Sequence, residues 1–160
     1  MSPRAVPALL AIFSVAALTA LIGPASAVAG AAPPSRPEYV AAADQICGTA
    51  LQRAKKFFHR GRKLIRKGHR ERGAKKIIKA WRRRDAGFDD VGDLERPVGD
   101  EATIERWLVL EAKATKLSIR AVKAYAQERG RRARKLKKRA VKKHERAVLV
   151  VSGYGFETCA

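Results

Sequence analysis

The stretch from Ser35 to Gly68, SRPEYVAAADQICGTALQRAKKFFHRGRKLIRKG, decides which fold the chain is expected to adopt. It opens on Ser-Arg-Pro-Glu, which matches a capping box with a proline inside the first helical turn. Apolar residues then recur every three or four positions, which places them on one face of a helix. These residues are Val40, Ala43, Cys47, Ala50, Ala54, Phe57 and Leu64. We expect a helix from about Arg36 to about Arg66, with Gly61 as a weak point and Gly68 as its end.

The next segment predicts a second helix, from about His69 to Asp85, with basic residues around a narrow apolar stripe. That stripe is Ala74, Ile77, Ile78 and Trp81. We expect Ala86-Gly87 to stop this helix, because glycine is a poor helix former. An irregular acidic loop is then predicted from Phe88 to Gly99.

The remaining chain predicts two further helices. Asp100 is a good N-cap for a third helix, which Gly130 ends. Its stripe is Ile104, Trp107, Leu108, Glu111, Ala114, Leu117, Ala121, Val122 and Tyr125. A fourth helix is expected from about Arg131 to Val151. Its stripe is Ala133, Leu136, Ala140, His144, Ala147, Val148 and Val151. We expect Trp81 and Trp107 to lie in the core.

Four amphipathic helices with short connections predict an all-α fold, an antiparallel four-helix bundle with up-down-up-down order. No period-two stretch long enough for a sheet is present, apart from the ambiguous run Val148 to Val151. The sequence Glu-Arg-Gly occurs at 71–73 and again at 128–130, which suggests two related hairpins. The predicted four-helix domain covers residues 36–160.

The start of the chain predicts export. Arg4 is the only charge ahead of an apolar run over residues 5–22, and a small-residue cleavage site, Ala25-Ser26-Ala27, follows. This order is that of a secretory signal peptide over residues 1–27, and residues 28–35 then form a flexible spacer. An uncleaved anchor is the alternative, because the run is near the lower length for a membrane span, roughly 17 residues. We expect a secreted protein, extracellular or in the cell envelope.

Two cysteines, Cys47 and Cys159, lie near the two ends of the exported chain. Outside the cytoplasm such a pair predicts a disulfide, which here closes a loop of 112 residues (159 − 47). The chain-entropy estimate for that loop is roughly 4–5 kcal/mol. No His lies near enough for a zinc site, and the Cys-x-x-Cys spacing of a redox pair is absent.

Three short motifs carry a resemblance. They are Tyr-Val-x-x-Ala-Asp-x-Ile-Cys (Tyr39 to Cys47), Pro-x-Gly-Asp-Glu-x-x-Ile-x-Arg-Trp-Leu (Pro97 to Leu108) and Tyr-Gly-Phe-x-x-Cys (Tyr154 to Cys159). Together they resemble an uncharacterised family of small exported or membrane-anchored helical proteins of high-GC Gram-positive bacteria. The resemblance implies the paired cysteines and the four-helix layout, and it implies no activity. This chain departs from the family by being more basic and by lacking a proline run before Gly-Asp-Glu.

Composition allows a core and demands a positive surface. The 160 residues suit one domain, 46% are hydrophobic, and 35 Lys and Arg against 15 Asp and Glu give a formal charge of +20. A multi-domain enzyme, a collagen and a polytopic membrane protein are excluded. The formal charge is +15 over residues 53–84, +10 over 129–146 and −4 over 85–128. The outward faces of the second and fourth helices are therefore expected to form a continuous basic surface.

That surface predicts electrostatic, sequence-indifferent binding of a polyanion, namely a wall polymer, an anionic lipid surface or nucleic acid. The candidate polyanion-binding residues are Lys75, Lys76, Arg82, Arg83, Arg84, Arg131, Arg132, Arg134, Lys135, Lys137, Lys138, Arg139, Lys142 and Lys143. The alternative is a structural or ligand-pocket protein of the cell envelope whose basic surface serves only solubility. We expect a monomer.

No catalytic, cofactor or metal site is expected. The three histidines, His59, His69 and His144, have no i, i+4 pair, and no serine has the context of a nucleophile elbow. The one dense carboxylate cluster lies in residues 89–95 and lacks the alternating pattern of an EF-hand. A loose Ca²⁺ site there is the alternative to an acidic loop that lies against the basic helices. The prediction is a non-enzymatic bundle.

Overall fold

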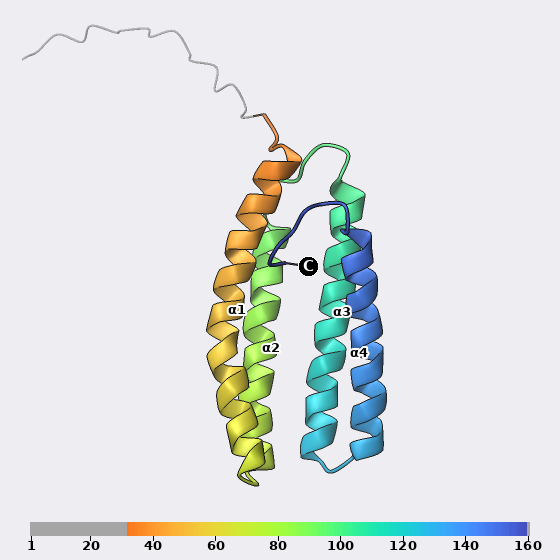
Figure 1. Cartoon of the computed structure of the whole chain (residues 1–160). Coiled ribbons are helices and arrows are strands. Elements are labelled where there is room, and N and C mark those ends of the chain that lie inside the picture. The colour runs from red at the N-terminus through yellow and green to blue at the C-terminus, as the bar shows by residue number, and fades with distance from the viewer. Residues whose placement is uncertain (1–31, 160) are drawn as a thin grey trace, which may run out of the picture. The chain divides into compact units, whose positions relative to one another are not determined.

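The structure, a computed structural model, describes residues 32–159 and contains four helices and no strand within that range (Figure 1). The helices are α1 (Arg36–Arg66), α2 (Arg70–Gly92), α3 (Glu101–Ala126) and α4 (Gly130–Val150). Consecutive helices run in opposite directions, which confirms the predicted antiparallel bundle. None of these helices combines the length and the apolarity needed to cross a membrane. The predicted signal peptide, residues 1–27, lies outside the described residues.

Helix α2 is longer than predicted. The stop expected at Ala86-Gly87 does not occur, and the helix continues to Gly92 through the first part of the predicted loop. Gly87 is buried against α1, where a Cβ atom would lie 2.4 Å from the Cβ of Ala50. The glycine therefore permits a close helix contact and does not end the helix. Phe88 and Val91, in the additional turn, are buried in the core.

The two helical hairpins repeat with an offset of 60 residues. In the first turn the backbone N–H groups of Lys67, Gly68 and His69 donate to the carbonyls of residues 63, 65 and 64, and residues 127–129 repeat the same pattern 60 positions later. The turns share a left-handed residue, with φ of 83° at Gly68 and 60° at Glu128. The Glu-Arg-Gly sequences, 57 residues apart, are out of register with this repeat.

Small side chains allow the paired helices to approach closely. Buried small residues recur every seven positions, a spacing typical of left-handed coiled-coil packing. They are Cys47, Ala54 and Gly61 on α1, Gly73, Ala80 and Gly87 on α2, Ala114 and Ala121 on α3, and Ala133, Ala140 and Ala147 on α4. A Cβ atom at Gly61 would lie 2.6 Å from Cγ1 of Ile77 and 2.9 Å from the carbonyl oxygen of Gly73. Gly61 is thus a contact point, and α1 runs through it.

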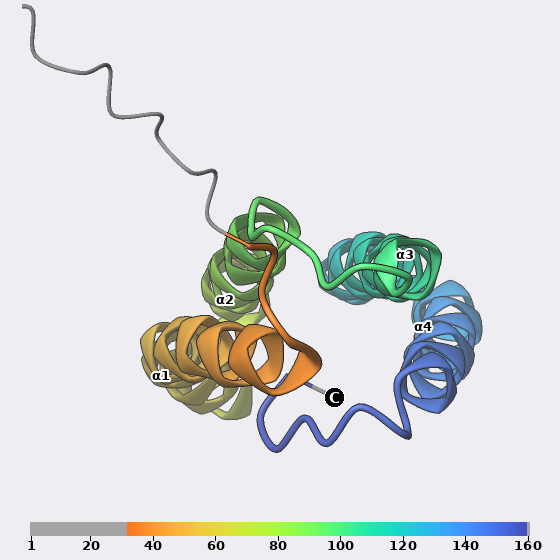
Figure 2. The same ribbon diagram turned by 90° about the horizontal axis from the view of Figure 1, so that it is seen from above.

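The four helices do not close into a ring. Helix α1 packs on α2, α2 on α3, and α3 on α4, whereas α1 and α4 have no pair of Cα atoms within 8 Å. Figure 2 shows this opening from above, with the C-terminal segment crossing it. A groove described below lies in the opening.

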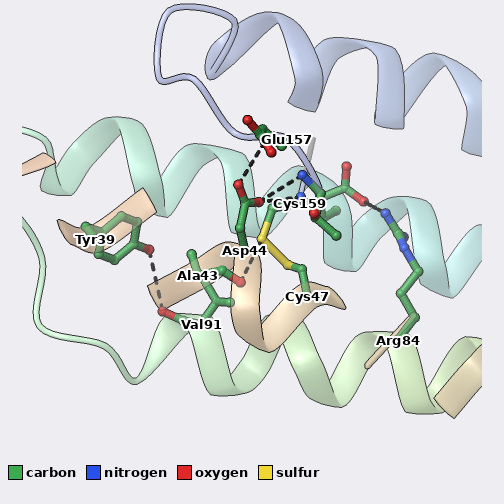
Figure 3. Close-up of a disulfide and its surroundings, with 10 residues drawn as sticks. Tyr39, Ala43, Asp44, Cys47, Arg84, Val91, Glu157 and Cys159 are labelled. Atoms are coloured by element: carbon green, nitrogen blue, oxygen red, sulfur yellow. Dashed lines mark hydrogen bonds and ion pairs between the residues drawn. A yellow bond between two sulfur atoms is a disulfide. The ribbon is translucent and has the colours of Figure 1, made fainter. Parts of the chain in front are cut away.

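The C-terminal segment, residues 151–159, is fastened across one end of the opening. Cys159 forms the predicted disulfide with Cys47, at a Cα–Cα distance of 5.3 Å. The carboxylate of Asp44 accepts hydrogen bonds from the backbone N–H groups of residues 157–159 at 2.8, 3.0 and 2.9 Å (Figure 3). The disulfide and the carboxylate together hold the tail against α1.

The three motifs of the resemblance meet at this end of the bundle. The Phe156 ring stacks on Trp107 at a centroid distance of 4.9 Å and meets Tyr39 edge-on at 6.4 Å. Trp107 is fully buried, as predicted, and the hydroxyl of Tyr39 donates to the carbonyl of Val91 at 3.5 Å. Each ring comes from a different motif, so the motifs encode the packing of this end of the domain.

Asp100 stands at the N-cap of α3, as predicted, but its side chain does not cap the helix. Its carboxylate accepts two hydrogen bonds from the guanidinium of Arg36, at 2.8 and 2.7 Å. This bidentate pair holds the pKa of Asp100 below its usual range. It joins the start of α1 to the start of α3.

Candidate functional site

Charge is divided along the length of the bundle. The half that contains the two interhelical turns, residues 53–84 and 113–143, holds 30 of the 35 Lys and Arg and 2 of the 15 Asp and Glu, a formal charge of +28. The other half, residues 32–52, 85–112 and 144–159, holds 4 Lys and Arg and 13 Asp and Glu, a formal charge of −9. We call these the basic half and the acidic half.

Helix α3 contributes to the basic half, although the sequence did not predict it. Its second part carries four exposed basic residues, Lys113, Lys116, Arg120 and Lys123. Lys123 lines a shallow depression together with basic residues of α2. The formal charge of −4 over residues 85–128 does not reveal this contribution, because that segment crosses from the acidic to the basic half.

The predicted polyanion-binding residues all lie in the basic half, and most are exposed. Helices α2 and α4 have no pair of Cα atoms within 8 Å, whereas α3 packs on both of them. Arg84 takes a different place from the rest, because its side chain is only 14% exposed and points to α3. It belongs to a buried ion-pair cluster rather than to the outer surface.

That cluster is centred on Glu111, which is fully buried at the boundary between the two halves. Its Oε2 accepts a hydrogen bond from Nη2 of Arg84 at 3.1 Å, and its Oε1 lies 2.6 Å from Nδ1 of His144. A carboxylate out of contact with water must be paired, because the interior does not solvate its charge. Arg84 and His144 stand 60 residues apart, so equivalent positions of the two hairpins supply the two partners.

The sequence itself contains a signal for this cluster. Glu111 and His144 lie on the apolar stripes predicted for the third and fourth helices. An acidic residue on the buried face of a helix requires a partner, because Glu is almost never fully buried alone. Which residues supply it depends on how the helices pack.

An apolar groove of about 370 Å³ lies beside the cluster, and all four helices line it. Leu51 and Phe58 of α1 and Val141 of α4 form its sides, and Trp81 of α2 contributes an aromatic wall. Trp81 was predicted to lie in the core; it is instead partly exposed and meets Phe58 edge-on, with the ring centroids 5.3 Å apart. Leu51 and Val141 are 37% and 44% exposed.

A smaller cavity of about 130 Å³ lies between the groove and the tail. It shares Leu51, Arg84 and His144 with the groove, and Cys47 and Cys159 line its other side. The buried cluster therefore separates a small space under the disulfide from the larger groove.

Within residues 32–159, no group of three or more His, Cys, Asp or Glu side chains is placed to hold a metal ion. Neither a protein-family model, nor a curated protein, nor a solved structure matches the chain.

Proposed function

We propose that this protein is an exported, non-enzymatic binder of polyanions, which it holds electrostatically with the basic half of the bundle. The observation that carries the proposal is the division of charge, +28 against −9 along one domain. Clustered like charges destabilise the helices that carry them. A polymer with many phosphates would relieve that repulsion and release its own counterions on binding.

Export is part of the same proposal. The apolar run, the small-residue cleavage site and the disulfide are typical of a protein that works outside the reducing cytoplasm. We also propose membership of the family that the three motifs resemble. The natural polyanion would then be a wall polymer or another anionic component of the envelope, and contacts to phosphates would carry no sequence preference.

The proposal predicts binding that weakens steeply with salt. The test is the affinity of the oxidised chain from Val28 onward for long-chain inorganic polyphosphate across a salt series. Both buried apolar clusters that the structure describes lie in this chain. Log affinity should fall linearly with log salt concentration, as counterion release requires. Glycerol-phosphate polymer, duplex DNA and anionic vesicles are the arms that rank the polyanion classes.

Two variants of equal net charge separate a binding surface from a general effect of charge. Arg132→Gln with Lys135→Gln removes two exposed charges from the basic half, and Arg106→Gln with Arg146→Gln removes two exposed charges from the acidic half. The first pair should lower the salt slope by about 0.9 per lost phosphate contact, or by up to about 2. The second pair should bind as the unmodified chain does.

Equal binding by both pairs would support the alternative, a structural or ligand-pocket protein whose basic surface serves only solubility. The apolar groove favours the ligand-pocket version of that alternative, because a pocket lined by all four helices is typical of ligand sites in bundles.

A further inference from the structure

The apolar groove lies in the opening between α1 and α4, and electrostatic binding of a polymer makes no use of it. Leu51 of α1 and Val141 of α4 lie on the two sides of this opening, and no helix within residues 32–159 covers them. Phe58 and Trp81 continue the apolar lining between them. The volume of about 370 Å³ is within the range of small-molecule sites, about 300–1,000 Å³. The groove is therefore large enough for a ligand, and its walls favour an apolar one.

The charges around the groove indicate where the charged head group of a ligand would lie. Arg84 and His144 line its inner end, but both are already paired with Glu111. Lys137 of α4 also lines the groove, and it has no ion-pair partner among the salt bridges of the described residues. Most residues that line the groove, Lys137 included, belong to the basic half, so the potential at Lys137 is positive. An anionic head group fits that position, and a cationic one does not.

We propose that the groove binds one linear acyl chain of an anionic amphiphile, with its carboxylate or phosphate head beside Lys137. The apolar chain lies against Phe58, Trp81 and Val141 and ends near the buried Glu111 cluster. The disulfide-fastened tail closes the space beyond that cluster. This proposal does not rest on polyanion binding, because it requires an apolar chain and a single negative charge.

The test uses dodecanoate, below its micelle concentration, titrated into the oxidised chain from Val28 onward. Calorimetry should give saturable binding of one molecule per chain, and the fluorescence of Trp81 should change on binding. Trp81→Phe should lose most of that fluorescence change, since Trp107 is buried away from the groove. Dodecyl phosphate tests a phosphate head, and dodecyltrimethylammonium should bind at least tenfold more weakly than dodecanoate.

Matched variants on α4 locate the site. Val141→Asp places a carboxylate in the wall of the groove and should weaken dodecanoate binding at least tenfold. Leu149→Asp makes the same change at a more exposed residue of α4, 71% exposed and outside the groove, and should leave binding unchanged. Lys137→Gln should weaken dodecanoate binding several-fold, whereas Lys138→Gln, outside the groove, should not. Circular dichroism checks that each variant is folded.

Several results would overturn this proposal. They are equal dodecanoate affinity of the two Asp variants, many molecules bound per chain, or equal affinity for the cationic amphiphile. If Val141→Asp does not fold, the comparison of Lys137→Gln with Lys138→Gln decides, and equal affinities reject the site. Polyphosphate binding by Lys137→Gln should match that of Lys138→Gln, because each removes one exposed charge from the basic half, so failure of either proposal is recognised separately.

Discussion

Gly87→Ala places a methyl group in the closest contact between α1 and α2. Its Cβ atom would lie 2.4 Å from the Cβ of Ala50, whereas apolar carbon atoms in contact stay about 3.5–4.0 Å apart. The two helices must therefore move apart by about 1 Å or more. Overpacking of this kind costs about 1–3 kcal/mol, and the better helix propensity of alanine returns about 1 kcal/mol. We expect the free energy of unfolding to fall by about 1 kcal/mol, and by up to about 2 kcal/mol.

The measurement is urea unfolding of the oxidised protein, followed by far-ultraviolet circular dichroism. Gly48→Ala is the control, because a Cβ there meets only Cγ2 of Thr158, at an ordinary 3.8 Å. This variant should be as stable as the unmodified chain, or more stable by up to about 1 kcal/mol. Adding Ala50→Gly to Gly87→Ala moves the methyl group from α1 to α2. The double variant should therefore lose less free energy of unfolding than the sum of the losses of the two single variants.

A Gly87→Ala protein that is stabilised as much as Gly48→Ala would contradict this prediction. That result would mean that α1 and α2 are not in close contact at this level. Gly87 would then be no more than a weak helix position, as the sequence alone suggests.

Three further predictions concern the disulfide and two titrating groups. Reduction of Cys47–Cys159, which closes a loop of 112 residues, should lower the free energy of unfolding by roughly 4–5 kcal/mol, measured by urea unfolding with and without reductant. Burial and the nearby charge of Asp89 raise the pKa of Asp85, so the ionised form of Asp85 destabilises the fold. Asp85→Asn should therefore raise the midpoint of thermal unfolding at neutral pH. In acid the midpoints of the variant and of the unmodified chain should converge, because Asp85 is then protonated. Burial raises the pKa of Tyr39 from 10.0 to about 12, so the stability that its neutral form contributes is complete below pH 10 and is lost as the pH rises to about 12. In an alkaline titration, helix loss should accompany the phenolate absorbance of Tyr39. The Tyr39→Phe variant should unfold at higher pH than the unmodified chain.

The sequence by itself determined the local structure. Apolar spacing predicted α1 from Arg36 to Arg66, as it is in the structure, and it predicted the order of the four helices. The cysteine pairing also followed, because only two cysteines exist and four alternating helices bring both to the same end. The helices depend on neighbours along the chain, and two cysteines can form only one disulfide.

Local patterns were insufficient where a residue's role depends on what packs against it. Gly87 predicted a helix stop, but it lies inside α2, where the nearby methyl group of Ala50 on α1 leaves no room for a side chain. Asp100 was placed correctly at its N-cap, but the carboxylate binds Arg36, which is 64 residues away along the chain. In both cases the competing partner belongs to another helix.

Tertiary structure decided the candidate site. The run of residues 85–128 is acidic when counted along the chain, yet its second part joins the basic half, because antiparallel helices place residues at the same height that are far apart in sequence. The partners of Glu111 come from α2 and α4 for the same reason. The groove exists because α1 and α4 do not pack together, and no helix sequence specifies that separation by itself.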